Sequence, residues 1–136
     1  MRFIAHRANI HGKCTEEENT ISKINKAIAL AYDVEIDVRK IDNKLFLGHD
    51  CPQEEIKLDY LYKNKENLWI HAKDLITFIY ILDLSDPLQT FLHDVDNAVL
   101  TNTGKIWTHP RDPLGLSKDL PWYAFPIHKN QRRPLR

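Results

Sequence analysis

The sequence predicts an α/β fold with a mainly parallel sheet, because runs of strand-type residues alternate with runs of helical spacing. The clearest strand is residues 34–41, where apolar Val34, Ile36 and Val38 alternate with polar neighbours. The clearest helix is residues 20–32, where apolar residues recur every three or four positions. No internal repeat or linker divides the chain, so we expect a single domain over residues 1–126.

The first half of the chain contains three further predicted features. Residues 3–5 form a short apolar run that predicts a buried strand at the N-terminus. Asn19 or Thr20 is a suitable N-cap for the helix that follows. Asp42 and Asn43 predict a turn after the second strand, which leads into an extended segment at residues 44–49.

The second half continues the alternation with shorter elements. We expect a short helix at residues 58–62, a strand at 68–73, a helix at 75–84 and a strand at 90–93. The helix at 75–84 is ambiguous, because it is rich in β-branched and aromatic residues. Weaker strands at 98–101 and 105–108 flank a turn. Beyond Pro110 only residues 122–125 resemble an ordered element, and residues 127–136 are a basic tail.

Composition argues against several classes of function. The chain has 19 basic and 19 acidic residues, so no net charge attracts it to nucleic acid or to an anionic membrane. Cys14 and Cys51 do not make a disulfide framework. The N-terminus lacks a signal peptide and no apolar run is long enough to span a bilayer. We therefore expect a cytoplasmic protein with reduced thiols that does not bind nucleic acid.

Ionisable residues gather at the ends of the predicted strands. His6-Arg7 and His49-Asp50 are two such ends, and ligands of parallel α/β folds bind beyond the carboxyl ends of the strands. Glu35 and Asp37 point to the same side of one strand, as do His71 and Lys73 of another. Two buried carboxylates on one face favour a bound divalent cation. The alternative for Glu35 and Asp37 is the solvated face of a half-exposed strand.

Four short motifs occur in order: His6-Arg7, Glu18-Asn19-Thr20, Glu35-Ile36-Asp37 and His49-Asp50. This series resembles the opening of the glycerophosphodiester phosphodiesterase family, over residues 3–50 and more loosely as far as Lys73. The resemblance implies a TIM-barrel-like fold and a metal-dependent phosphodiester hydrolase that acts on a small substrate. That family typically attacks the phosphorus with a neighbouring hydroxyl of the substrate and passes through a cyclic phosphate.

The resemblance also implies a role for each matching residue. His6 and His49 would be the general acid and base, and Arg7 and Lys73 would bind the phosphate. Glu35 and Asp37 would bind a metal, most simply Mg²⁺ or Ca²⁺. Further residues at the expected site are Glu18, which would orient its neighbours or cap the helix, and His71, which stands where the family has a third metal carboxylate. An imidazole there also makes Mn²⁺ or Zn²⁺ possible metals.

The chain departs from the family in sequence and in length. Ala8 replaces a glycine, and Glu17 replaces a proline. A complete barrel takes about 250 residues, or about 200 at the low end, so 136 residues predict an incomplete or truncated (βα)n barrel with about five or six strands. Open sheet edges predict a homo-oligomer. Two other functions remain open: an inactive relative that binds a phosphorylated small molecule, and a structural subunit.

Overall fold

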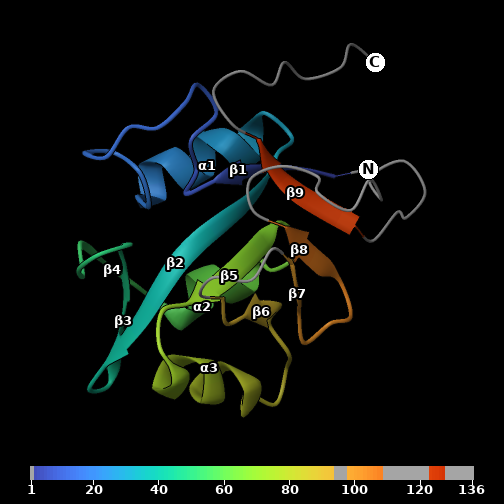
Figure 1. Cartoon of the computed structure of the whole chain (residues 1–136). Helices are drawn as coiled ribbons and strands as arrows, with labels where there is room; N and C mark the ends of the chain where they lie inside the picture. Colours follow the sequence, from blue (N-terminus) through green and yellow to red (C-terminus); the bar gives the residue numbers. More distant parts are fainter. Residues whose placement is uncertain (1, 94–97, 109–122, 128–136) are drawn as a thin grey trace.

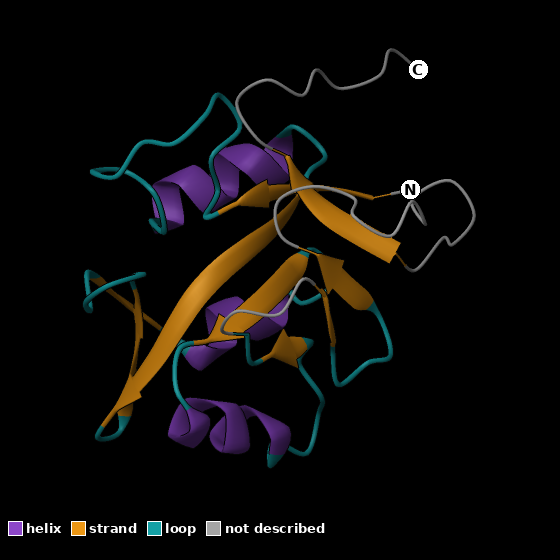
Figure 2. Cartoon of the chain, in the orientation of Figure 1, coloured by secondary structure: helices purple, strands orange, loops and turns teal. Residues whose placement is uncertain are grey.

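The computed structural model describes residues 2–93, 98–108 and 123–127, which form one nine-stranded sheet and three helices (Figure 1). Figure 2 shows the helices at the periphery of the sheet. In chain order the elements are β1 (Arg2–His6), α1 (Ile21–Ala29), β2 (Asp33–Ile41), β3 (Lys44–Leu47), β4 (Glu54–Ile56), α2 (Leu58–Lys63), β5 (Leu68–Ala72), α3 (Leu75–Leu82), β6 (Thr90–Phe91), β7 (Ala98–Leu100), β8 (Ile106–Thr108) and β9 (Tyr123–Ile127).

Six strands form a continuous parallel series in the order β6-β5-β2-β1-β9-β8. Three hairpin strands add antiparallel pairs: β3 on the second half of β2, β4 on β3, and β7 on β8. The nine-residue strand β2 therefore pairs with β1, β3 and β5 (Figure 1). The predicted number of five or six strands was wrong, because hairpin strands extend the parallel series.

The two ends of the parallel series are joined by a side chain. Asn102, in the turn between β7 and β8, donates from Nδ2 to the carbonyl of Leu88 over 2.9 Å. Its backbone N–H donates to the carbonyl of Thr90, and its Oδ1 accepts from the N–H of Thr90. The sheet thus curls until β6 meets this turn. No ladder of strand pairs closes the ring among the described residues, so the truncated barrel predicted from the sequence stays a prediction.

One face of the sheet packs against the helices. Its core contains Val34, Ile36 and Val38 of β2, together with Ile24 of α1 and Ile81 of α3, all fully or almost fully buried. Burial of each such side chain contributes about 1.5–3 kcal/mol. We call this the helix-covered face. The alternation of β2 puts Glu35 and Asp37 on the opposite face, which we call the inner face.

Local capping explains where two helices begin and end. The side chain of Thr20 accepts a hydrogen bond from the N–H of Lys23 at the start of α1. After α1 the chain turns at Ala31 with φ of 64°, a left-handed conformation that ends the helix. Asp74 accepts from the N–H of Thr77 over 2.7 Å, so a cap supports helix α3 despite its β-branched residues.

Most predicted elements lie within a few residues of the observed ones. Strand β4 was not predicted, because two of its three residues are glutamates, which are uncommon in strands. Strand β9 covers residues 123–125 of the segment predicted to be ordered, and it also includes Ile127, which we had assigned to the basic tail. Trp122 and residues 128–136 of that tail lie outside the described residues.

Two smaller observations concern helix length and the cysteines. Within the described ranges, no helix has the length and apolarity needed to cross a membrane. Cys14 and Cys51 are both free thiols.

Candidate active site

Strand register builds the centre of the site. β2 and β5 run parallel, with Glu35 opposite Trp69 and Asp37 opposite His71. All four side chains therefore project from the same inner face. The inner face carries two groups of side chains. One is apolar and consists of Ile4, Trp69, Phe91 and Trp107. The other is polar and begins with the two carboxylates and His71.

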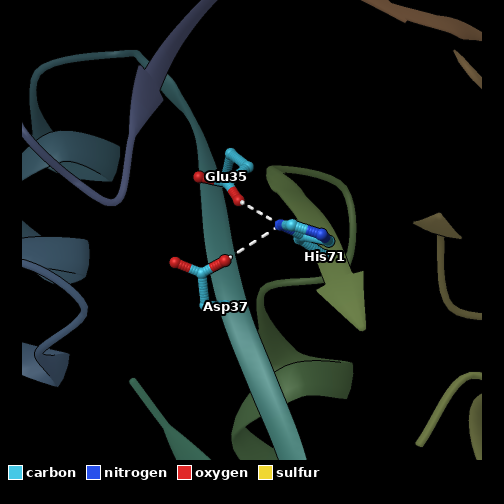
Figure 3. Close-up of side chains that lie close together, drawn as sticks. All are labelled: Glu35, Asp37 and His71. Atoms are coloured by element: carbon cyan, nitrogen blue, oxygen red, sulfur yellow. Dashed lines mark ion pairs between the residues drawn. The ribbon is translucent and has the colours of Figure 1, made fainter. Parts of the chain in front are cut away.

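Glu35, Asp37 and His71 form a compact cluster of possible metal ligands (Figure 3). Nδ1 of His71 lies 2.9 Å from Oδ1 of Asp37 and 3.6 Å from Oε1 of Glu35. Both carboxylates are fully buried. Neither of these two oxygens accepts a well-directed hydrogen bond from any residue that the structure describes. Buried, unsatisfied carboxylate oxygens that face an imidazole nitrogen fit a cation-binding site.

The other side of the His71 ring is anchored. Nε2 lies 3.2 Å from the backbone carbonyl oxygen of His93, and the ring stacks on Phe91 with centroids 5.0 Å apart. Burial by itself would lower the pKa of His71. The contacts with Asp37 and Glu35 outweigh burial and raise that pKa to about 9 in the metal-free protein.

The two carboxylates have opposite pKa shifts. Burial, together with the negative charge of Asp37, raises the pKa of Glu35 above its ordinary value. Burial acts in the same direction on Asp37. There it is outweighed by His71, by Lys73 and by a hydrogen bond from Asn19, so the pKa of Asp37 is lowered. Asp37 is accordingly the carboxylate that ionises more readily, and it is the electrostatic centre of the site.

Arg7 follows β1 directly and contacts most of the site. Its backbone N–H donates to Oε2 of Glu35 over 3.0 Å, and its guanidinium donates to Oε1 of Glu18 over 3.2 Å. The guanidinium Nε lies 3.4 Å from Oδ2 of Asp37. Arg7 and Ala8 have left-handed φ angles of 54° and 65°. The second of these explains why a glycine would suit the position of Ala8.

His49 is held between cations and an anion. Its Nδ1 is 3.2 Å from Oδ2 of Asp37 and 3.3 Å from Nζ of Lys73, and its Nε2 is 3.0 Å from a guanidinium nitrogen of Arg7. Burial and the positive charges of Arg7 and Lys73 lower the pKa of His49, although Asp37 acts in the opposite direction. His49 is therefore neutral at pH 7.

A tight turn presents His49 to the site. Gly48 has φ of 146°, and a Cβ atom there would lie 1.9 Å from the carbonyl oxygen of Cys51. The Gly48 N–H donates to the carbonyl of Asp37 over 3.1 Å, and Arg39 donates to the carbonyl of His49. The turn is therefore fixed to β2, the strand that carries both carboxylates.

Lys73 and His6 complete the polar group. Nζ of Lys73 is 3.6 Å from Oδ1 of Asp37. Nε2 of His6 is 3.7 Å from Oε2 of Glu35, and its ring lies 6.3 Å from the ring of Trp107. The structure thus brings together every residue that the sequence analysis placed in the site, through contacts that link His6, Arg7, Glu18, Glu35, Asp37, His49, His71 and Lys73.

The sequence predicts no part in the site for three positions that support it, although it offers Asn19 as a possible N-cap. Asn19 holds Asp37 through two hydrogen bonds, and Asn9 donates to Oε2 of Glu18 over 3.1 Å. Asn19 was visible as part of the Glu18-Asn19-Thr20 motif, but its partner was not. The contact of His71 with the carbonyl of His93 could not be identified from the sequence, since every residue has a backbone carbonyl.

Comparison of the chain with models of protein families, with curated proteins and with solved structures found no match. The family resemblance therefore depends on the order of the four motifs, and the roles that it implies are proposals supported by the geometry of the site.

Proposed function

We propose that the protein is a metal-dependent phosphodiester hydrolase that acts on a small substrate and is related to the glycerophosphodiester phosphodiesterases. One observation carries the proposal: the buried Glu35–Asp37–His71 cluster lies beside Arg7, Lys73 and His49 on one face of the sheet. Hydrolysis of a phosphodiester requires groups of these kinds. Cations bind the nonbridging phosphate oxygens, and a neutral proton acceptor takes the proton of the attacking hydroxyl.

The metal site accounts for the two unsatisfied buried oxygens. Glu35, Asp37 and His71 would hold a divalent ion, which when bound supplies a Lewis acid that polarises the phosphoryl group. Arg7 and Lys73 are positioned to bind the remaining phosphate charge. Both are now paired with Asp37, so a phosphate would replace one contact of each with a charge-assisted hydrogen bond.

His49 is suited to the role of general base. Arginine only donates hydrogen bonds, so Nε2 of His49 accepts from Arg7 and carries no proton. If Arg7 turned to a phosphate oxygen, this lone pair would become free to take the proton of an attacking hydroxyl. The lowered pKa of His49 keeps the ring neutral and ready for that step.

His6 is the proposed general acid. Its Nε2 lies 3.7 Å from Oε2 of Glu35, so a buried carboxylate is close enough to stabilise the protonated imidazole. His6 lies at the end of β1 and His49 follows β3. The two rings therefore reach the cluster from different strands, His6 beside Glu35 and His49 beside Asp37.

The decisive experiment is turnover of a panel of small phosphodiesters with Mg²⁺, Mn²⁺, Ca²⁺ or Zn²⁺. Wild-type protein should hydrolyse at least one diester only when metal is present. His6→Ala and His49→Ala should each reduce kcat by about 10²–10⁴-fold. His11→Ala, which removes an exposed histidine of the β1–α1 loop, is the matched control and should retain activity. Equal rates for all four proteins would mean that a contaminant is responsible.

A second candidate is an inactive protein that binds a phosphorylated small molecule. It is favoured by the full engagement of His49, whose two ring nitrogens both have protein partners. In that case the same panel would give no turnover, while inorganic phosphate or a phosphomonoester would bind in the presence of metal and Arg7→Ala would abolish binding.

A further inference from the structure

The geometry of the Glu35–Asp37–His71 cluster also bears on which kind of ion the site would hold. Its three ligand atoms lie within 4.8 Å of one another, with separations of 2.9 Å and 3.6 Å from Nδ1 of His71 to the two oxygens. Ligand atoms about 2.1 Å from one ion lie roughly 3.0–3.5 Å apart when they are neighbours in tetrahedral or octahedral geometry. The cluster therefore needs little movement to hold a small dication.

The orientation of the His71 ring is the second observation. A carbonyl oxygen only accepts hydrogen bonds, so the contact of 3.2 Å with the carbonyl of His93 puts the ring proton on Nε2. In the neutral ring Nδ1 then carries a lone pair, and this lone pair points at the unsatisfied oxygens of Glu35 and Asp37. Metal-binding histidines typically donate their other ring N–H to a carbonyl or a carboxylate in this way. Stacking on Phe91 fixes the plane of the ring.

The charge around the cluster is the third observation. Arg7 and Lys73 lie 3.4 Å and 3.6 Å from oxygens of Asp37, and Arg7 also pairs with Glu18, so two cations offset most of the negative charge of three carboxylates. Mg²⁺ and Ca²⁺ depend on oxygen ligands and on the number of negative charges. A first-row transition metal gains more from an imidazole nitrogen.

We infer that the Glu35–Asp37–His71 cluster is selective for a first-row transition-metal dication, of the class of Mn²⁺, Co²⁺ and Zn²⁺, over Mg²⁺ and Ca²⁺. His71 is the residue that sets this preference. The inference rests on the metal site of the proposed function and does not depend on the reaction. If the protein binds transition metals selectively but has no phosphodiesterase activity, this inference holds and the proposed function fails. If it is an active enzyme that prefers Mg²⁺, the proposed function holds and this inference fails.

The test is metal affinity measured without substrate. Purified protein, stripped with a chelator, is dialysed against each ion alone, and the bound metal is counted by elemental analysis. Wild type should bind one Mn²⁺, Co²⁺ or Zn²⁺ per chain about 100-fold or more tightly than Mg²⁺ or Ca²⁺. The Co²⁺ form should have visible absorption bands of a nitrogen-containing site.

Two variants test whether His71 sets the preference for transition metals. His71→Asp gives an all-oxygen set and should reduce the ratio of transition-metal to Mg²⁺ affinity by about tenfold or more, with a change in the Co²⁺ bands. His11→Asp makes the same substitution at an exposed histidine and should behave as wild type. Wild-type preference for Mg²⁺ or Ca²⁺, the absence of stoichiometric binding of any ion, or an unchanged ratio in His71→Asp would each overturn the inference. If His71→Asp does not fold, the wild-type ratio and the Co²⁺ spectrum decide.

Discussion

Asn19 holds the carboxylate of Asp37 in a closed pair of hydrogen bonds, since its amide donates to Oδ2 and its Oδ1 accepts from the backbone N–H of Asp37, each over 2.9 Å. Both residues are completely buried. The pair leaves Oδ1 of Asp37 as the oxygen that faces His71. A residue of the β1–α1 loop therefore decides how a carboxylate of β2 is presented.

Loss of this pair should be costly. Asn19→Ala removes two hydrogen bonds worth about 1 kcal/mol each and puts alanine at a φ of 55°, which costs roughly 1 kcal/mol more, so we expect a loss of about 3 kcal/mol in the free energy of unfolding. Asn19→Gly removes the amide without the backbone strain and should lose about 2 kcal/mol. Urea unfolding of the three proteins measures both values. If both variants lost almost no free energy of unfolding, the amide of Asn19 would have no structural role.

His71 makes the stability of the metal-free protein depend on pH. Its pKa is about 9 in the folded state, against an ordinary value of 6.5, so the folded state binds the proton more tightly. The resulting stabilisation is complete below pH 6.5, decreases as the pH rises and is absent above about pH 9. It corresponds to about 3 kcal/mol. Urea unfolding in chelator between about pH 6 and pH 10 should show this decrease. His71→Asn should lack it, and parallel curves for the two proteins would refute the assignment.

Gly48 offers a test of the turn that carries His49. Gly48→Ala combines a φ of 146° with a Cβ position 1.9 Å from a carbonyl oxygen, so we expect a loss of more than about 2 kcal/mol and a change in the titration of His49 observed by NMR. Gly104→Ala is the matched control. Its φ is 80° and nothing lies within 4 Å of the new methyl group, so only backbone strain of about 1 kcal/mol applies. Similar losses for both variants would show that the turn tolerates displacement.

Ala31 is a position where the protein can be stabilised. It is exposed and has a left-handed φ of 64° immediately after α1, so Ala31→Gly relieves strain without loss of packing. We expect the free energy of unfolding to rise by about 1 kcal/mol. Ala29→Gly, within the last turn of α1, should instead lower it by roughly 0.5–1 kcal/mol. Thermal melts of both variants provide the check. Stability changes of the same sign in the two variants would contradict the capping geometry.

Oligomeric state remains a prediction for solution measurement. Helix α3 exposes Leu75, Ile76, Ile79 and Leu82, and the described sheet still has open edges at β4 and β7. Association of two chains would reduce the exposure of both kinds of surface. Light scattering at micromolar concentration should give the mass of a dimer. Monomer mass across the concentration range would reject the prediction and leave the active-site proposals unaffected.

The elements that sequence predicted best are those with a strong local pattern. Strand β2 and helix α1 each contain one clear hydrophobic period, and the inner-face positions of Glu35 and Asp37 followed from it. Pairing between distant polar residues could not be predicted this way. Asn102 reaches the backbone at Thr90 across a turn, and Asn19 reaches Asp37 from another element, so neither contact has a local signature. The strand β4 depends on pairing with β3 and not on its own composition.

For the site, the sequence predicted which residues take part but not how they are oriented. The cluster of Glu35, Asp37 and His71 was expected because strand alternation and motif order both pointed to it. The orientation of His71 was not, because it is set by the carbonyl of His93 and by the ring of Phe91. Residue type determines which groups can act, whereas their direction depends on contacts made only in the folded chain.

The alternation of β2 has a consequence for how this protein can change. Val34, Ile36 and Val38 pack under the helices, while Glu35 and Asp37 between them face the other way. Random variation at the first set should therefore alter the amount of folded protein in a cell, whereas variation at the second should alter ligand recognition together with stability, since Asp37 also pairs with Asn19. One stretch of five residues thus contributes to two traits, and a new specificity at Glu35 or Asp37 must arise together with a compensating gain in stability elsewhere in the fold.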